Sequence, residues 1–289
     1  MAIYRFSAQL IKRSEGRSST ACAAYRSGTL IECDREGRTH DYRRRSGVVN
    51  SFVMTPPSAP AWMRDRSKLW NAVERVERRR DAQLSREIQL ALPHELPRGA
   101  RQALVTGFVL RRLVSAGMVA DVSIHAPDDD GDNRNHHAHV MLTLREIDGD
   151  GFGKKQRAWN DRALLEDWRE AWAADCNQAL AYAQRPERVD HRSLAAQQTE
   201  AEEKGDRAAA DALRRLPEPK LGPIAARARN RGQAHPRAAR WSRVRQINGK
   251  LAQAWGNFAR SLDTARKELA RQVRPEPPES GPPTPGFSP

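Results

Sequence analysis

A run of histidines near the middle of the chain has the spacing of a metal site. Residues 135–145 read NHHAHVMLTLR. Side chains alternate along a strand, so His137 and His139 would point to one side with their Cα atoms about 6–7 Å apart. Two imidazoles at that spacing can bind the same cation. His136 would point to the opposite face, and we do not expect it to be a ligand.

A third histidine, His125, ends the preceding segment 119–125, VADVSIH. If the acidic turn at 128–135 joins two antiparallel strands, His125 lies close to His137 and His139. A divalent cation held by neutral imidazoles keeps its full charge, which can withdraw electrons from a scissile phosphate. The alternative is a surface cluster that binds metal only incidentally, and the residues alone leave both readings open.

Chemistry at a phosphate also needs a nucleophile, and the chain contains 4 tyrosines. Tyr4 falls in an expected strand, and Tyr182 ends an expected helix, where packing is the predicted role. Tyr42 adjoins a run of arginines and could stack on or contact DNA. Tyr25 follows the small residues ACAA, which leave space around its ring. A phosphate ester of a phenol keeps a good leaving group, so a DNA hydroxyl can later reverse the attack. Elimination makes Tyr25 the first choice of the four.

The charge of the chain favours a polyanionic partner. Lys and Arg number 50 against 36 Asp and Glu, which gives a formal net charge of +14. Each basic side chain that neutralises a phosphate releases a condensed counterion. Charge alone does not separate DNA from RNA or from an anionic membrane. If the polyanion is DNA, the predicted contacts are Arg43, Arg44, Arg45 and the arginine-rich stretch 74–80, although a charged helix face is as often merely solvated.

The location of the protein is predicted from two features of the sequence. No apolar run approaches the ~18 residues of a membrane span, so we expect no membrane insertion. The 3 cysteines are scattered and predict neither a disulfide framework nor a Cys-x-x-Cys metal site. A reducing cytoplasm is therefore the expected compartment.

The elements that must position these residues read as an α+β domain. Alternating or apolar runs predict strands at 3–11, 48–54, 83–92, 119–125 and 137–145, with a hairpin turn at 35–37. Helical spacing predicts helices at 21–26, 65–81, 98–116, 160–184 and 238–272. This order favours an antiparallel sheet with helices on one face, followed by a helical C-terminal extension. Trp168 and Trp172 lie on a stripe that we interpret as core rather than as a platform for stacking bases.

Six segments, taken in order, carry a family resemblance. They read AIYRFSAQLI, GRSSTACAAYRSG, HDYRRRSGVV, LSREIQLALPHEL, SIHAPDDDGDNRNHHAHVMLTLRE and RVDHRSL with EPKLGP. In these segments the sequence resembles the MobA/MobL family of mobilisation relaxases, within the class named for a His–hydrophobe–His strand. The resemblance covers roughly residues 1–225 and implies a ferredoxin-like or palm-type antiparallel sheet.

The resemblance also implies an activity. It is metal-dependent single-strand DNA nicking at a plasmid transfer origin, with a 5′-phosphotyrosyl intermediate and later religation during conjugative mobilisation. The family's functional residues match Tyr25 as the catalytic tyrosine and His125, His137 and His139 as metal ligands. The family glutamate matches Glu87, with a role in assisting the tyrosine or orienting a histidine. From the residues alone, Glu87 could equally be a salt-bridged strand residue beside Arg86.

The family's cofactor is Mg²⁺ or Mn²⁺, although imidazoles favour later transition metals. Implied partners are single-stranded origin DNA, a coupling protein and accessory DNA-binding proteins of a transfer system. We expect a nicking domain at 1–190, a basic helical extension at 191–273 and a disordered Pro-rich tail at 274–289. Two alternatives remain. One is a rolling-circle replication initiator or transposase of the same class, against which the third histidine argues. The other is a non-catalytic, basic DNA-binding accessory protein.

Overall fold

The computed structural model describes residues 2–127, 132–219 and 221–272 of the chain. It separates into two compact units, residues 1–191 and 192–289, which are described one at a time. Part of the expected acidic turn (128–131) and the expected disordered tail (274–289) lie outside the described residues. All of the predicted site residues fall in the first unit.

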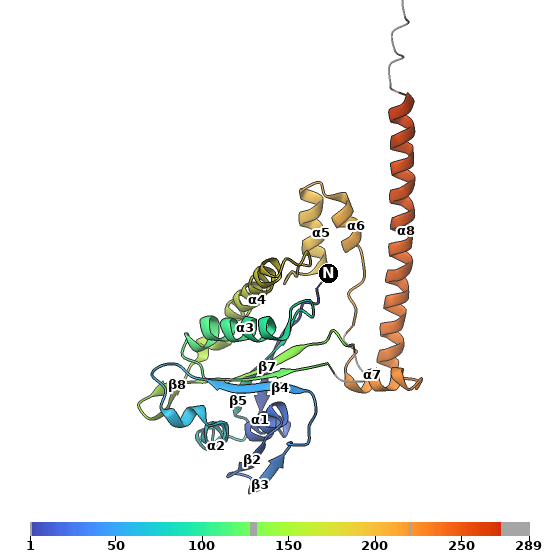
Figure 1. Cartoon of the computed structure of the whole chain (residues 1–289). Helices are drawn as coiled ribbons and strands as arrows, with labels where there is room; N and C mark the ends of the chain where they lie inside the picture. The colour runs from blue at the N-terminus through green and yellow to red at the C-terminus, as the bar shows by residue number, and fades with distance from the viewer. Residues whose placement is uncertain (1, 128–131, 220, 273–289) are drawn as a thin grey trace, which may run out of the picture. The chain divides into compact units, whose positions relative to one another are not determined.

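A five-stranded sheet forms the centre of the first unit, with the strand order β1-β5-β7-β6-β4 (Figure 1). Its strands are β1 (Phe6–Lys12), β4 (Val48–Met54), β5 (Gln83–Ala91), β6 (Ala120–His125) and β7 (His137–Leu142). Each neighbouring pair is antiparallel. The expected antiparallel α+β fold is therefore confirmed, with β7 in the middle of the sheet.

Helices cover both faces of this sheet rather than the one face expected from the order of elements (Figure 1). The four main helices are α1 (Ser19–Ser27), α2 (Arg66–Val76), α3 (Arg98–Val109) and α4 (Arg162–Tyr182). Ile88 and Val140 pack with α3 and α4 on one face. Ile11 and Met141 pack with α1 and α2 on the other. Because both faces carry buried apolar side chains, each must be covered by another layer.

The tryptophan stripe of α4 belongs to the core, as expected. Trp172 is fully buried, and its ring meets Phe108 edge-on with the ring centroids 5.1 Å apart. Trp168 is buried in the same cluster. Tyr182 is different, because its side chain at the end of α4 is 94% exposed. The expectation that it packs is wrong, since α4 has turned that position away from the sheet.

Helix α1 is short, and its sequence defines both of its ends. The side chain of Ser18 caps the first turn by accepting a hydrogen bond from the Ala21 N–H at 3.0 Å. At the other end Gly28 adopts a left-handed conformation, φ 65°, which favours glycine. Ala23 and Ala24 are buried against the core, and their small size brings the helix close to the sheet. Tyr25 consequently lies on the outer side of α1.

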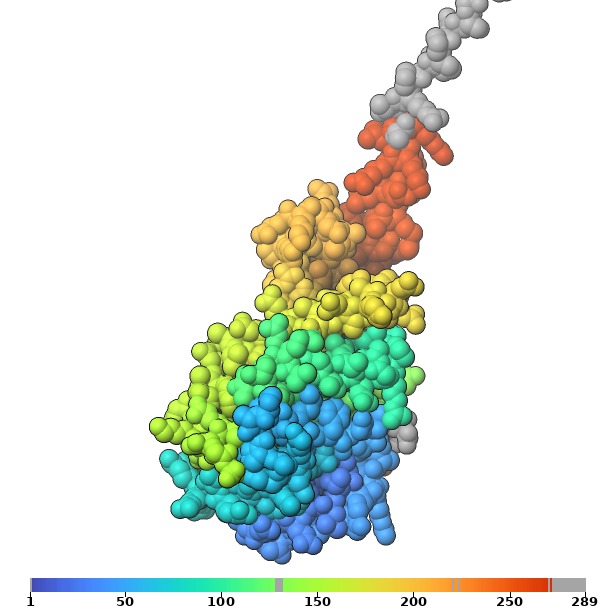
Figure 2. All heavy atoms as spheres, turned by 60° about the vertical axis from the view of Figure 1, so that its left-hand side comes forward, coloured from blue at the N-terminus to red at the C-terminus, as the bar shows by residue number. Residues whose placement is uncertain are grey.

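Two small antiparallel hairpins complete the first unit. They pair β2 (Leu30–Cys33) with β3 (Arg38–Asp41), and β8 (Arg145–Asp148) with β9 (Gly151–Lys155). The turn between β2 and β3 falls where the hairpin was expected. Helix α2 ends at Val76, so Arg78, Arg79 and Arg80 follow the helix instead of extending it. Figure 2 shows one face of this unit in space-filling form, coloured from blue to yellow along the chain.

The second unit is helical. Its helices are α5 (Leu194–Glu203), α6 (Arg207–Leu213), α7 (Pro223–Asn230) and α8 (Pro236–Gln272). Helix α8 confirms the long helix expected at 238–272. The guanidinium carbons of Arg229 and Arg245 each lie 4.8 Å from a ring centroid of Trp241. Among the described helices of both units, none combines the length and the apolar character of a membrane span.

Candidate active site

The structure brings His125, His137 and His139 together on the sheet face that α1 covers. The β6–β7 register places His125 opposite His137, and Ser123 opposite His139. The three ring centroids are 5.0–5.2 Å apart. One ring nitrogen from each histidine lies within 4.8 Å of the others. His136 does not belong to this group.

Each imidazole has a partner on one nitrogen. The three pairs are His125 Nε2 to the Arg26 carbonyl at 2.7 Å, His137 Nδ1 to the Asn135 carbonyl at 2.9 Å and His139 Nδ1 to Glu87 Oε1 at 2.6 Å. Carbonyl and carboxylate oxygens only accept hydrogen bonds, so each of these nitrogens carries the ring proton. The other nitrogen of a neutral ring is then unprotonated, as a metal ligand must be.

The protonation of His125 also suits a metal ligand. Burial lowers the pKa of His125 to about 3, its hydrogen bond to the Arg26 carbonyl opposes the shift, and the neighbouring histidines add to it. The ring is therefore neutral at physiological pH. A set of three neutral imidazoles fits a divalent cation of the first transition series, whereas Mg²⁺ prefers oxygen ligands.

Glu87 lies at the bottom of the site on β5, with only 2% of its surface exposed. Its carboxylate accepts hydrogen bonds from His139, from Gln9 Nε2 at 2.5 Å and from both Nε and Nη2 of Arg26. Burial alone would raise the pKa of Glu87, but the hydrogen bonds from His139 and Arg26 outweigh burial and hold this pKa well below its usual range. Glu87 thus contacts a histidine and is also salt-bridged. Its main cation is Arg26, and Arg17 lies farther away at 3.8 Å. The adjacent Arg86 does not pair with it, because the Arg86 side chain points to the opposite face and donates to the Trp159 carbonyl.

Arg26 is the residue that sequence reasoning missed. Its carbonyl binds His125, and its guanidinium binds Glu87 with Nη2 and Oε2 2.6 Å apart. Through Glu87 it also reaches His139, so two of the three histidines are joined to the C-terminal end of α1. The only signal in the sequence was its position next to Tyr25.

Tyr25 is attached to this site through its neighbour Arg26. Its side chain is 47% exposed, and its ring meets Tyr42 edge-on with centroids 5.2 Å apart. The Arg45 guanidinium carbon lies 3.7 Å from the centre of the Tyr25 ring, and Arg45 Nη1 donates to the Tyr25 carbonyl at 3.0 Å. Arg45 therefore contacts protein, whereas Arg44 is exposed. Arg43 is also exposed, and it pairs with Asp41 at 2.8 Å.

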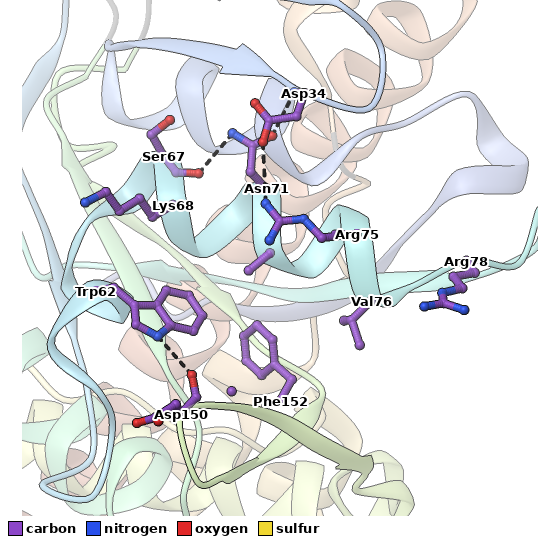
Figure 3. Close-up of a pocket in the computed structure, with 12 residues that line it drawn as sticks. Asp34, Trp62, Ser67, Lys68, Asn71, Arg75, Val76, Arg78, Asp150 and Phe152 are labelled. Atoms are coloured by element: carbon purple, nitrogen blue, oxygen red, sulfur yellow. Dashed lines mark hydrogen bonds and ion pairs between the residues drawn. The ribbon is translucent and has the colours of Figure 1, made fainter.

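A separate cavity of about 700 Å³ lies between α2 and the β8–β9 hairpin (Figure 3). Trp62 and Phe152 meet edge-on in it, with ring centroids 6.1 Å apart. Lys68, Arg75 and Arg78 add basic groups to its lining. Of the described residues that line this cavity, none belongs to the histidine cluster.

The fold and the site define the class: an α+β protein with a three-histidine centre on an antiparallel sheet, beside a helix that carries an exposed tyrosine. The chain belongs to the MobA/MobL family, whose family model matches residues 17–211. This confirms the family expected from the six sequence segments.

Individual relatives point the same way. The mobilization protein MobL of Acidithiobacillus ferridurans is 38% identical over 233 residues, which are 70% of this chain and 61% of that protein. The conjugal transfer protein TraA of Agrobacterium fabrum is 42% identical over 168 residues, which are 55% of this chain and 15% of that protein. The chain thus spans less than two thirds of either relative.

A solved structure also matches this chain in sequence and fold. It comes from work on the molecular basis of vancomycin resistance transfer in Staphylococcus aureus. The match has a TM-score of 0.61 and 30% sequence identity, and it covers 66% of this chain and 100% of that chain.

Proposed function

We propose that this protein nicks one strand of DNA at a plasmid transfer origin, with Tyr25 as the nucleophile. The observation that carries the proposal is that Arg26 joins α1 to the histidine cluster by two groups. Its carbonyl binds His125, and its guanidinium binds Glu87, which binds His139. This attachment holds the residue next to Tyr25 against two of the histidines. Membership of the MobA/MobL family supports the same reaction class.

The proposed chemistry is a reversible transfer of a phosphodiester. Tyr25 Oη forms a bond to phosphorus, the bond between phosphorus and the 3′ oxygen breaks, and the phenol proton leaves as the 3′ oxygen gains one. The product is a 5′-phosphotyrosyl ester and a 3′ hydroxyl. Because the phenolate is a good leaving group, a 3′ hydroxyl can later displace Tyr25 and religate the strand.

His125, His137 and His139 would hold the divalent cation, and Mn²⁺ suits their nitrogen donors better than Mg²⁺ does. When bound, the cation would withdraw electrons from the scissile phosphate and offset charge in the transition state. Glu87 does not act on the phosphate in this scheme. Its carboxylate keeps the Nδ1 proton on His139, so that Nε2 faces the cation.

DNA is the proposed partner of the basic surface near Tyr25. Arg43 and Arg44 are exposed beside the Arg45–Tyr25 contact, where they can neutralise phosphates of the strand being cut. The cavity with Trp62 and Phe152 offers aromatic edges beside basic groups, a combination found where single strands bind. A coupling protein, accessory DNA-binding proteins and a cytoplasmic location complete the proposal.

The test is formation of a covalent adduct. The full chain is incubated with a 5′- or 3′-labelled single-stranded oligonucleotide from its transfer origin and Mn²⁺, then resolved on a denaturing gel. We expect the label on the 3′ side of the nick to migrate with the protein, and no adduct from Tyr25→Phe. Tyr182→Phe is the matched control, because Tyr182 is even more exposed and should leave the adduct unchanged.

The outcomes separate the candidate nucleophiles. An adduct of normal yield from Tyr25→Phe would overturn the assignment, and its loss in Tyr42→Phe instead would transfer the role to Tyr42. If no origin sequence gives an adduct while the chain still binds the oligonucleotide, the protein is a non-catalytic DNA-binding accessory protein.

A further inference from the structure

A second group of metal-binding side chains lies in the β2–β3 hairpin, away from the three histidines. It consists of Cys33 at the end of β2, Glu36 in the turn and His40 on β3. One donor atom from each residue lies within 4.8 Å of the others. The register pairs Ile31 with His40, and alternation puts Cys33 on the face of Ile31. Cys33 and His40 therefore point to the same side of the hairpin.

The two hydrophobic clusters of the first unit include none of these three side chains. Cys33 is only 1% exposed, yet it belongs to neither hydrophobic cluster of the first unit. His40 Nε2 is a buried atom without a hydrogen-bond partner among the described residues, and it lies 3.6 Å from Glu36 Oε2. A buried polar atom left without a partner costs free energy, so a native site of this kind calls for an explanation.

The hairpin also needs support that its own length does not supply. A two-stranded hairpin is marginally stable by itself, and β2 and β3 have four residues each. Side chains join it to α2 at several points. Asn71 donates to the Glu32 carbonyl at 2.7 Å and accepts from the Asp34 N–H at 2.9 Å, Arg75 pairs with Asp34 at 3.6 Å, and Ile31 is buried in the cluster that α2 shares. Beyond the hairpin the chain continues directly into Tyr42 and Arg45, which pack on Tyr25.

We propose that Cys33, Glu36 and His40 form a three-ligand zinc site that stabilises the hairpin. A thiolate, a carboxylate and an imidazole are the three ligand types that zinc takes in proteins, and a water can fill the fourth tetrahedral position. The negative charges of the thiolate and the carboxylate balance the cation. Zinc bonds of 2.0–2.3 Å put neighbouring ligand atoms about 3.3–3.8 Å apart. His40 Nε2 and Glu36 Oε2 already have this spacing, 3.6 Å.

The bound ion would join the turn and both strands of the hairpin. It would thereby hold the segment that carries Tyr42 and Arg45 beside Tyr25, while taking no part in the chemistry. Such a site differs from the histidine centre in its donor set, because only the hairpin site contains a sulfur ligand. This difference makes the two sites separable by spectroscopy.

The experiment is a Co²⁺ titration of the full, reduced chain, followed in the near ultraviolet. We expect a thiolate-to-cobalt charge-transfer band that saturates at one ion of this type per chain and disappears when Zn²⁺ is added. Cys33→Ser should abolish the band, and Glu36→Gln should weaken Co²⁺ binding at this site at least about tenfold. Glu36 is exposed, so this second variant tests the site without disturbing the core. Cys22→Ser is the matched control and should keep the band.

The outcomes distinguish this proposal from the proposed nicking activity. His137→Ala should keep the thiolate band even though it loses the histidine site, and Tyr25→Phe should keep it as well. Absence of the band in the wild-type chain, or its persistence in Cys33→Ser, would overturn the zinc site and leave the nicking proposal untouched. If Cys22→Ser loses the band while Cys33→Ser keeps it, the thiolate ligand is Cys22, and the zinc site proposed at Cys33 is overturned.

Discussion

The carbonyl oxygen of Arg26 accepts a hydrogen bond from His125 Nε2 at 2.7 Å, which joins the last turn of α1 to the end of β6. The guanidinium of the same residue binds the buried Glu87, which in turn binds His139. A single residue therefore links the helix that carries Tyr25 to two strands of the histidine centre. This linkage explains how a side chain on the surface is positioned by a buried network.

Arg26→Ala should loosen this network. It leaves the Glu87 carboxylate without its main cation, and removal of one partner from a buried ion pair costs about 3–5 kcal/mol. We expect the free energy of unfolding to fall by an amount near the lower end of this range, because His139 and Gln9 still donate to Glu87. Mn²⁺ affinity should fall about 10–100-fold, the usual effect of losing an outer partner of a ligand.

Urea denaturation and Mn²⁺ calorimetry measure the two effects separately. Arg26→Lys is the informative companion, since lysine restores the charge but not the two-pronged contact. It should recover more stability than metal affinity. Equal Mn²⁺ affinity in the wild type and Arg26→Ala would show that Arg26 does not position the ligands.

Adjacent histidines offer a matched pair at the centre itself. His137 has its ring in the cluster, whereas His136 lies outside it. His137→Ala should therefore reduce Mn²⁺ binding to the level of nonspecific sites, and His136→Ala should leave it within about twofold, well under the 10–100-fold change that outer partners produce. Calorimetry on both variants decides the matter, and equal losses in the two would contradict the three-histidine centre.

Arg45 and Arg44 should have different effects on DNA cleavage. Arg45 stacks on the Tyr25 ring, a contact worth about 0.5–1 kcal/mol at an exposed site, so Arg45→Ala should slow adduct formation a few-fold at saturating DNA. Arg44 is exposed, and no such contact with Tyr25 is seen among the described residues. If Arg44 contacts one phosphate, Arg44→Ala should weaken single-strand binding. The slope of the logarithm of the binding constant against the logarithm of the salt concentration should then become shallower by about 0.7. Single-turnover rates and salt titrations distinguish them; a normal rate in Arg45→Ala would refute the positioning role.

Gly28→Ala should destabilise the end of α1. Gly28 has φ +65°, and an added Cβ would lie 3.1 Å from Val48 Cγ2. A left-handed non-glycine residue costs roughly 1–2 kcal/mol, and the contact with Val48 adds to this. Gly37→Ala is the control, because it has φ +59° with nothing within 4 Å of the new Cβ. Thermal unfolding should show a larger loss for Gly28→Ala, and equal losses would mean that Val48 simply moves aside.

The sequence by itself determined the local parts of the site. His137 and His139 share a face because a strand repeats every two residues, and α1 ends at Gly28 because glycine favours the left-handed cap. Both are properties of a few consecutive residues. The interpretation of the α4 tryptophans as core followed from helical spacing in the same way. The prediction of Tyr25 as the nucleophile depended on the family resemblance.

Only the tertiary structure decided which distant residues meet. Glu87 reaches His139 because β5 pairs with β7, and Gln89 rather than Glu87 lies directly opposite His139 in that register. Glu87 binds Arg26 instead of neighbouring Arg86 because consecutive strand residues point to opposite faces. The tertiary structure likewise decided that helices cover both faces of the sheet, α1 and α2 on one face and α3 and α4 on the other. Pairing between strands far apart in the chain depends on the packing of the whole domain, so local periodicity could not reveal it.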